Sequence, residues 1–273
     1  MDEPTKRRLA SSTRFGDIRE LVEVDSTNRY LMDLARTGAP EGVVVVADFQ
    51  SAGRGRRGRT WEAPAGGALL ASILLRPLDG TGAPATGPGT ERRWLAPAAV
   101  ALAAADACTA VSGAGGVVPA IKWPNDLLLG DAKLAGILAE ADAGAIVVGI
   151  GINVSSAPAG AASLGAAVDR GGLLAGLLDH LERWCDRWDE VAPAYLRRCA
   201  TVGRQVRVET PDGAVVGRAE AVEADGRLRV LVSEPAAGPV APGGPAGGGG
   251  GGEVRWFSAG EVVHLRAAGG PPG

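Results

Sequence analysis

Apolar residues in the first two thirds of the chain follow two spacings, one typical of strands and one of helices. Short apolar runs, of which that at 43–48 is β-branched, predict strands at residues 18–24, 43–48, 68–75, 121–123, 127–129, 133–140 and 146–154. Helical spacing occurs at residues 26–38, 92–111 and 173–190. The first helix should begin at Ser26, Thr27 and Asn28, whose side chains can cap free N–H groups, and end at Gly38. We therefore expect an α+β fold in which helices flank a mixed sheet.

The pattern changes after Arg198, where only short strands are expected. They fall at residues 205–209, 215–223, 228–232, 254–257 and 262–265, a small all-β module of SH3-like size. A Pro/Ala/Gly tract at 235–252 interrupts the module, and its composition predicts a disordered insert. Residues 77–91, rich in Gly, Pro and Thr, predict a mobile surface loop. The expected division is a flexible N-terminus at 1–16, a main domain at 17–200 and the β-module at 201–267.

Composition narrows the class of protein. The chain has 273 residues, 46% of them hydrophobic, which is enough for two globular domains. Its formal net charge of −3 argues against wholesale binding of nucleic acid, which usually requires a basic surface. We find neither the apolar stretch of a secretory signal nor an uncharged run of membrane-spanning length. Three isolated cysteines and two histidines fit neither a disulfide framework nor a zinc site, so we expect a cytoplasmic protein.

A loop between two expected strands gathers positive charge. Residues 50–61 read QSAGRGRRGRTW and hold four arginines within six positions: Arg54, Arg56, Arg57 and Arg59. Guanidiniums bind carboxylates and phosphates through paired hydrogen bonds, and glycines let the backbone fold around a ligand. Because like charges repel, we expect the loop to be disordered until an anion binds. A solvated basic loop or an RNA-contacting patch would also explain it. A dinucleotide fold would not, because Pro64 and Gly66 oppose the helix that should follow.

Two further segments combine polar residues with expected strands. Lys122, Asn125 and Asp126 lie around a Trp-Pro turn, and Lys133 follows in an otherwise apolar strand. An unpaired buried lysine is costly, so Lys133 should meet an anion or point outward. Residues 149–153 read GIGIN, and glycine within a strand often marks close approach of a ligand or backbone. An ordinary turn and close sheet packing are the simpler interpretations of these segments.

Taken together, these motifs and their order resemble those of the biotin protein ligase family. The matching segments are residues 25–28 (DSTN), 53–61 (GRGRRGRTW), 122–126 (KWPND), 133–138 (KLAGIL) and 149–153 (GIGIN). They span about residues 20–155, and the terminal β-module fits the family's C-terminal domain. The resemblance implies a class II synthetase-like catalytic domain followed by a small SH3-like β-barrel. About 17 residues precede the first expected strand, too few for a winged-helix DNA-binding domain, so a monofunctional ligase is expected.

The resemblance also implies the reaction. The enzyme would use ATP and Mg²⁺ to convert biotin to biotinyl-5'-AMP, then transfer biotin to a lysine of a biotin carboxyl carrier protein. Mg²⁺ would arrive with the phosphates of ATP, so no protein metal ligands are expected. The partner would be the carrier domain of a biotin-dependent carboxylase, with no specific DNA binding and no membrane. A homodimer and a monomer both stay open.

Residue roles follow from the same resemblance. The biotin-binding set is Ser26, Thr27, Asn28, Gln50, Gly53, Arg54, Gly55, Arg56, Lys133, Gly136 and Gly149. The ATP-binding set is Arg59, Trp61, Lys122, Asn125 and Asn153. The catalytic set is Arg56, Lys133, Lys122 and Asp126. Gly136 and Gly149 would leave room for the ring of biotin, Trp61 would close the ordered loop, and Asp126 would orient or deprotonate the acceptor amine.

Three other functions remain in competition. A lipoate protein ligase shares the general fold and adenylation chemistry, although the Arg-rich loop and KWPND favour biotin. A nucleic-acid-binding protein would use the Arg-rich loop and the β-module, but the acidic net charge and few aromatic residues oppose it. A non-catalytic adaptor built on the β-module would leave Lys133 and residues 122–126 unexplained.

Overall fold

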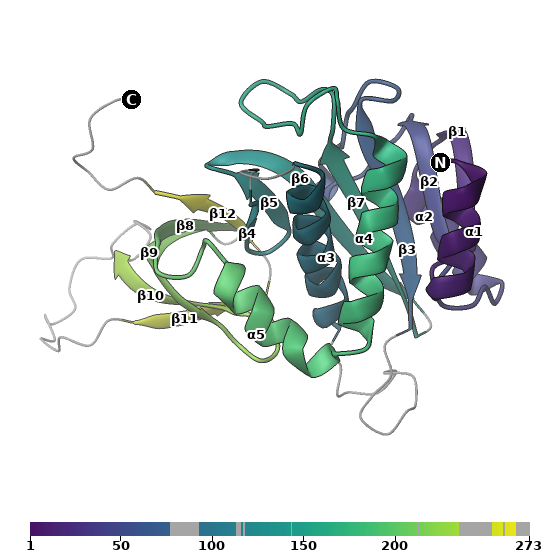
Figure 1. Ribbon diagram of the computed structural model, residues 1–273. Helices are drawn as coiled ribbons and strands as arrows, with labels where there is room; N and C mark the ends of the chain where they lie inside the picture. Colours follow the sequence, from purple (N-terminus) through teal and green to yellow (C-terminus); the bar gives the residue numbers. More distant parts are fainter. Residues whose placement is uncertain are drawn as a thin grey trace, which may run out of the picture. The chain divides into compact units, whose positions relative to one another are not determined.

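The computed structural model describes residues 1–76, 93–112, 116, 118–142, 144–211, 213–234, 253–258 and 260–265. It divides into two compact units, Met1–Arg198 and Cys199–Gly273 (Figure 1). The loop expected to be mobile at 77–91 and the insert expected at 235–252 lie outside the described residues. The domain boundaries expected from the sequence stay predictions.

A seven-stranded mixed sheet forms the frame of the first unit, in the order β1-β2-β3-β7-β6-β5-β4. Its strands are β1 (Ile18–Val24), β2 (Val44–Gln50), β3 (Ala68–Leu75), β4 (Ala120–Lys122), β5 (Asp126–Leu129), β6 (Ala132–Asp142) and β7 (Ala145–Asn153). Strand β1 pairs with β2 in parallel, and the remaining neighbours pair antiparallel. The expected α+β fold with a mixed sheet is confirmed.

Helices cover both faces of this sheet (Figure 1). They are α1 (Glu3–Ser12), α2 (Thr27–Arg36), α3 (Leu95–Val111), α4 (Arg170–Cys185) and α5 (Trp188–Arg198). Helices α3 and α4 lie together on one face, and α2 lies on the other. The helical pattern expected over 173–190 is thus two helices, because the chain leaves α4 at Cys185 and starts α5 at Trp188. In the described part of the chain, no helix is both long and apolar enough to cross a bilayer.

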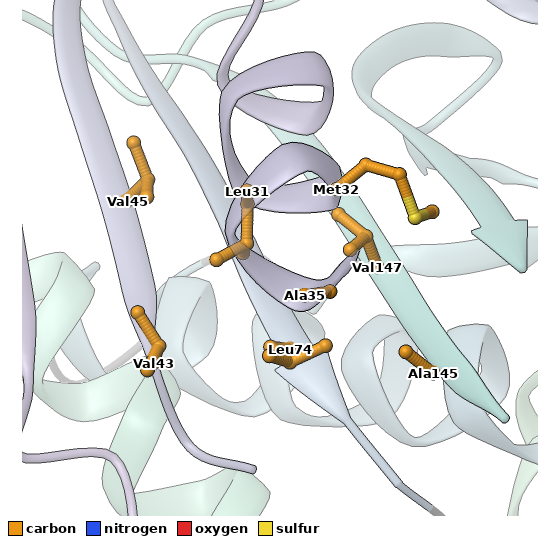
Figure 2. Close-up of a cluster of buried hydrophobic side chains, with 8 residues drawn as sticks. All are labelled: Leu31, Met32, Ala35, Val43, Val45, Leu74, Ala145 and Val147. Carbon is orange, nitrogen blue, oxygen red and sulfur yellow. The ribbon is translucent and has the colours of Figure 1, made fainter. Parts of the chain in front are cut away.

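A compact apolar cluster anchors α2 to the sheet (Figure 2). It comprises Leu31, Met32 and Ala35 from α2 with Val43, Val45, Leu74, Ala145 and Val147 from the strand side. Alternate residues of a strand face the same side, so Val43 and Val45 both meet the helix. Burial of this cluster fixes the position of the first turn of α2, where Ser26, Thr27 and Asn28 lie.

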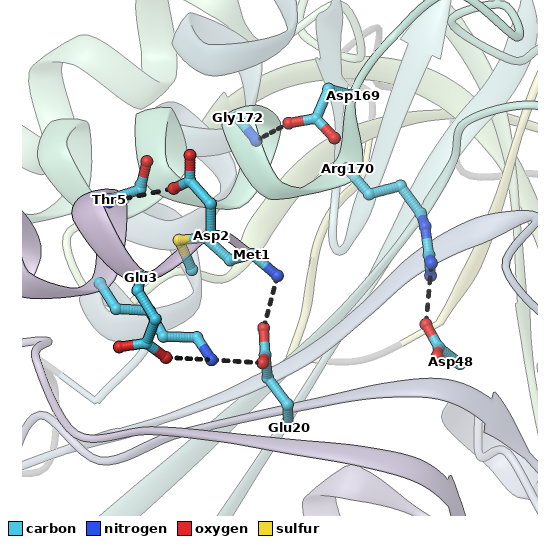
Figure 3. Close-up of polar contacts among 10 residues, drawn as sticks. Met1, Asp2, Glu3, Thr5, Glu20, Asp48, Asp169, Arg170 and Gly172 are labelled. Atoms are coloured by element: carbon cyan, nitrogen blue, oxygen red, sulfur yellow. Dashed lines mark hydrogen bonds and ion pairs between the residues drawn. The ribbon is translucent and has the colours of Figure 1, made fainter.

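The N-terminal residues, expected to be flexible, instead form α1, which is a correction to the sequence analysis (Figure 3). The Asp2 side chain accepts a hydrogen bond from the Thr5 amide at 3.0 Å and caps the helix. Lys6 then bonds to Glu20 of β1 at 2.6 Å. Leu9 and Phe15 are completely buried. Two apolar residues are too few to produce a helical pattern in the sequence, yet they suffice to dock the segment.

The second unit is a five-stranded antiparallel sheet in the order β11-β10-β9-β8-β12. Its strands are β8 (Gln205–Thr210), β9 (Gly213–Val222), β10 (Leu228–Glu234), β11 (Val254–Phe257) and β12 (Glu261–His264). Along β8, buried Val206 and Val208 alternate with exposed Gln205 and Arg207, as in a sheet with one covered face. The order begins at β11 and ends at β12, so the described strands show the expected β-module but not the expected barrel closure.

The anchoring of α2 gives a stability prediction. Leu31 is completely buried in the α2 cluster, so Leu31→Ala should lower the free energy of unfolding by about 2–5 kcal/mol. Val22→Ala is the control, because that side chain is 81% exposed on β1 and should cost less than about 0.5 kcal/mol. Denaturant unfolding of both variants makes the comparison, and equal losses would contradict the proposed anchor.

Candidate active site

The first turn of α2 is held by a side chain from another strand. Gln50, at the end of β2, accepts hydrogen bonds through Oε1 from the Thr27 backbone N–H at 2.8 Å and from the Thr27 hydroxyl at 3.0 Å. Ser26 occupies the N-cap position, but its side chain makes no capping hydrogen bond. Gln50 therefore takes over the capping of Thr27, and the nearly buried Ser26 hydroxyl is spared that role.

Ser72 of β3, which the sequence analysis missed, extends this network. Its hydroxyl lies 2.8 Å from the Thr27 hydroxyl and 2.6 Å from Asn28 Oδ1. With the contact between Gln50 Oε1 and the Thr27 hydroxyl, the network has three close oxygen–oxygen contacts. Only two hydrogens, those of the Thr27 and Ser72 hydroxyls, are present to fill them. The network is rich in acceptors and one proton short, which suits a ligand that brings N–H donors.

Asn28 ties α2 to β6. Its side-chain N–H group donates to the Leu138 carbonyl at 3.1 Å and to Glu140 Oε2 at 3.0 Å. A Cβ added to Gly149 would overlap Asn28 Oδ1. The space over Gly149, expected to accommodate a ligand ring, is therefore filled by Asn28, which corrects that expectation. The glycine allows close approach of α2.

The Arg-rich loop is folded, which differs from the expected disorder. The Gly55 amide donates to the Arg59 carbonyl at 2.7 Å, and the Trp61 amide donates to the Gly53 carbonyl at 3.0 Å. These bonds make a narrow hairpin with the short helical turn η1 (Arg56–Gly58) at its tip. A Cβ at Gly53 would overlap the Trp61 carbonyl oxygen, so this position requires glycine.

Arg54 and Arg56 of the loop turn toward different partners, and the charge of Arg57 still acts on Arg56. Arg54 Nη1 lies 2.9 Å from Glu140 Oε1, and Arg56 donates to Asn125 Oδ1 at 3.4 Å. Arg57 and Arg59 are exposed to solvent. Burial lowers the pKa of Arg56, and the nearby Asp126 carboxylate partly opposes that shift. A guanidinium stays charged in proteins, so this half-buried cation favours an anionic ligand.

Lys133, Asp126 and Trp61 form the second charged group of the site. Lys133 Nζ lies 2.7 Å from Asp126 Oδ1 and 5.7 Å from the centroid of a Trp61 ring. The lysine–aspartate contact is an ion pair whose alignment leaves Asp126 Oδ1 without a hydrogen bond. The prediction that Lys133 meets an anion is thus confirmed. Asp126, expected to act on an acceptor amine, faces Lys133.

Trp61 rests on two glycines of neighbouring strands. A Cβ at Gly151 of β7 would overlap the indole, and one at Gly136 of β6 would lie 3.0 Å from it. The indole Nε1–H is buried and finds no hydrogen-bond partner in the described part of the chain. A buried unpaired donor costs about 1–3 kcal/mol, so this N–H group points to an acceptor that a ligand supplies.

The remaining expected ATP residues lie at the edge of this group. Asn125 donates from its side chain to the Ile137 carbonyl at 3.1 Å, and Asn153 donates to the Ala162 carbonyl at 2.9 Å. Both side-chain amide nitrogens thus donate to backbone carbonyl groups. Lys122 is half-buried at the end of β4, in register with Asp126 of β5. The structure brings Arg56, Asn125, Asp126 and Lys133 together, and Arg59 is exposed.

Three residues of the site were missed from the sequence: Ser72, Glu140 and Gly151. Ser72 is the single polar residue of the fully buried strand β3, a signal that was available. Gly151 belongs to the glycine-isoleucine alternation, but only the structure places it under Trp61. Glu140 gave no signal, because a charged residue near a strand end is ordinary.

The arrangement can bind an anionic molecule that also has a polar head. Lys133 pairs with Asp126, and Arg56 bonds to the adjacent Asn125 and is attracted by the same carboxylate, so two cations lie near one carboxylate. Within the described ranges, no group of three His, Cys, Asp or Glu residues could hold a metal ion. Positioned cations and hydrogen-bond donors are the groups that the described residues supply.

Comparison with known proteins agrees with this geometry. Residues 21–156 match a family model described as the biotin/lipoate A/B protein ligase family. Residues 201–265 match one described as the biotin protein ligase C-terminal domain. A biotin–[acetyl-CoA-carboxylase] ligase of Mycobacterium tuberculosis is 36% identical over 260 residues, which cover 90% of this chain and 88% of the relative. A ligase of the same name from Paracoccus denitrificans is 36% identical over 231 residues, 76% of this chain and 91% of that protein.

A solved structure extends the likeness to the fold. The biotin protein ligase of Aquifex aeolicus in complex with biotin and ATP matches with a TM-score of 0.68 and 25% sequence identity. The match covers 93% of this chain and all of the other.

The glycine under Trp61 gives a test of the site geometry. Gly151→Ala should push the indole off β6 and β7 and shift its fluorescence emission to longer wavelength, because overlap with the new methyl forces it toward water. The Trp61 contribution is obtained as the difference from a Trp61→Phe variant. Gly176→Ala is the control, since its Cβ would lie 3.7 Å from Ala107, an ordinary contact. An unchanged Trp61 emission in Gly151→Ala would contradict the packing.

Proposed function

The chain belongs to the biotin protein ligase family, and we propose that its reaction is carried out by the residues gathered around α2, the Arg-rich loop and strands β5 to β7. The enzyme activates biotin with ATP to give biotinyl-AMP and transfers biotin to the carrier protein of acetyl-CoA carboxylase. The assignment of individual residues is our proposal. The observation that carries it is the ion pair of Lys133 with Asp126 beside Arg56, which bonds to the adjacent Asn125.

The first step needs charge compensation more than acid–base catalysis. A carboxylate like that of biotin is ionised at neutral pH, so it can attack the α-phosphate of ATP without a general base. A carbon-bound oxygen then bonds to phosphorus, and pyrophosphate departs with the electrons of the broken P–O bond. Two anions must approach each other, and Arg56 and Lys133 would offset their repulsion. The Lys133 ammonium is already held in place by Asp126 at 2.7 Å.

The polar network at α2 would bind the ureido head of biotin. That group carries two N–H donors and one carbonyl, and the Thr27, Gln50 and Ser72 oxygens form the proton-poor network described above. Ser26, Asn28, Gly53 and Gly55 would shape the same end of the pocket. The space over Gly136, expected to hold the ring of biotin, is taken by Trp61 and Lys133, and the Trp61 Nε1–H would gain an acceptor from the ligand.

The nucleotide would lie toward β4 and β7. We propose that Lys122 and Arg59 contact its phosphates, and that Asn125 and Asn153 shape its binding surface through the backbone carbonyls they hold. Mg²⁺, when it arrives with ATP, supplies further neutralisation of phosphate charge. No described cluster of protein ligands competes for the ion.

In the second step a lysine amine of the carrier attacks the acyl carbon. A C–N bond forms, the bond from carbon to the AMP oxygen breaks, and AMP leaves. The ammonium group of this lysine must first lose a proton, because only the neutral amine has a lone pair with which to attack. We propose that Asp126 orients this lysine, because its carboxylate already accommodates the ammonium of Lys133. A cytoplasmic location and the lack of specific DNA binding stay predictions, and a monomer and a homodimer both stay open.

The test of this function is biotin-dependent exchange of labelled pyrophosphate into ATP, with lipoate and octanoate run in parallel. Exchange with biotin alone is the expected result, since it reports reversible formation of the adenylate. Exchange with lipoate instead would move the activity to the lipoate branch of the family. Lack of exchange with every acid, in folded protein with Mg²⁺ present, would refute the proposal.

Lys133 gives a sharper test within the same assay. Lys133→Ala should reduce the exchange rate by about 10²–10³-fold, because one positioned cation of the transition state is lost. Lys133→Arg should keep part of the activity, since it retains the charge. Lys6→Ala is the matched control, because that lysine also makes an ion pair, at 2.6 Å with Glu20, but on β1. Full exchange activity in Lys133→Ala would rule out its role.

A further inference from the structure

Glu140 joins two parts of the site that are far apart in sequence. One carboxylate oxygen, Oε1, lies 2.9 Å from Arg54 Nη1 at the start of the Arg-rich loop. The other, Oε2, accepts a hydrogen bond from Asn28 at 3.0 Å. Neither the sequence motifs nor the reaction steps above use this residue. A single carboxylate on β6 therefore connects the loop to the first turn of α2.

The connection completes a ring of polar contacts. From Glu140 it runs through Asn28 to Ser72, then to Thr27 and Gln50. Gln50 and Arg54 are separated by only three residues, so the chain itself closes the ring. Within this ring, the Glu140–Arg54 contact attaches the start of the loop to β6, and the Arg56–Asn125 hydrogen bond holds the loop separately, outside the ring. Loss of the Glu140–Arg54 contact would leave the other members of the ring in place.

The ion pair is poorly suited to stabilising the fold. The Arg54 side chain is 53% exposed and that of Glu140 is 27% exposed. Exposed ion pairs contribute little to folding, because solvent screens them and ordering two long side chains costs entropy. Its consequence is local: it holds a loop whose four arginines would otherwise repel one another.

We propose that Glu140 is a positioning residue that holds the Arg-rich loop ready for biotin by binding Arg54. In this arrangement Arg54 anchors the loop, and Arg56 and Lys133 are the cations left for the reacting carboxylate. Ordering the loop before the ligand arrives removes part of the entropy cost of binding. The inference rests on the proposed function only in naming biotin as the ligand whose binding benefits.

Glu140→Gln separates this role from the contact with Asn28. Glutamine is nearly isosteric and keeps a carbonyl acceptor for Asn28, but it presents no charge to Arg54. The KM for biotin should rise about three- to fivefold, the range open to a partly exposed ion pair, with little change in kcat or in the KM for ATP. In an Arg54→Ala background the same substitution should add nothing, because its partner is already absent.

Asp142→Asn is the matched control. Asp142 lies on the same strand and pairs with an arginine, Arg36, at the same 2.9 Å, but it does not contact the loop. It should leave the KM for biotin unchanged. An unaltered KM in Glu140→Gln, a lowered one, or an equal rise in Asp142→Asn would each overturn the proposal.

A second measurement needs no activity. In the ligand-free protein, amide hydrogen exchange of residues 53–61 should be faster in Glu140→Gln than in wild type and Asp142→Asn, while α2 stays equally protected. Unchanged exchange in the loop would overturn the positioning role. If wild-type protein showed no biotin-dependent pyrophosphate exchange, the proposed function would fail, and this measurement would still decide whether Glu140 orders the loop.

Discussion

The site depends on the hydrogen bonds that Gln50 accepts from Thr27. A helix begins with free N–H groups, and here one of them is satisfied from the end of a different strand. That single glutamine fixes where α2 starts relative to β2. The apolar cluster beneath α2 then fixes how the helix lies on the sheet. Because the Ser26 hydroxyl is spared the capping role, the helix start can face a ligand.

The positive charges of the site are kept apart because each cation contacts a different partner. The loop carries four arginines, yet Arg54 turns to Glu140 of β6 and Arg56 turns to Asn125, which precedes β5. Lys133 of β6 is held by Asp126 of β5. The cations that would repel one another in an unfolded loop are thus distributed among separate partners. Their common target is an anion, which matches a reaction between a carboxylate and a triphosphate.

The sequence predicted β1 and β3 of the first sheet and β11 of the second to the residue, because short apolar runs there are clearly bounded. It missed α1, whose docking depends on two isolated apolar residues, Leu9 and Phe15. In the site, the motifs identified Gln50, Lys133 and the loop arginines. They did not include Ser72, although a single polar residue in an apolar strand was a usable signal, or Glu140, whose partners lie far away in sequence and leave no local pattern. The expected ligand space over Gly149 was wrong for the same reason, since Asn28 fills it.

The buried indole N–H of Trp61 has a consequence for selectivity among ligands. A molecule of the right shape that lacks an acceptor at that point would leave the N–H group as poorly satisfied as it is in the free protein. A molecule with an acceptor there would recover the whole of that penalty on binding. Discrimination between two close analogues could therefore reach about tenfold or more from this one atom, without any clash to exclude the weaker one.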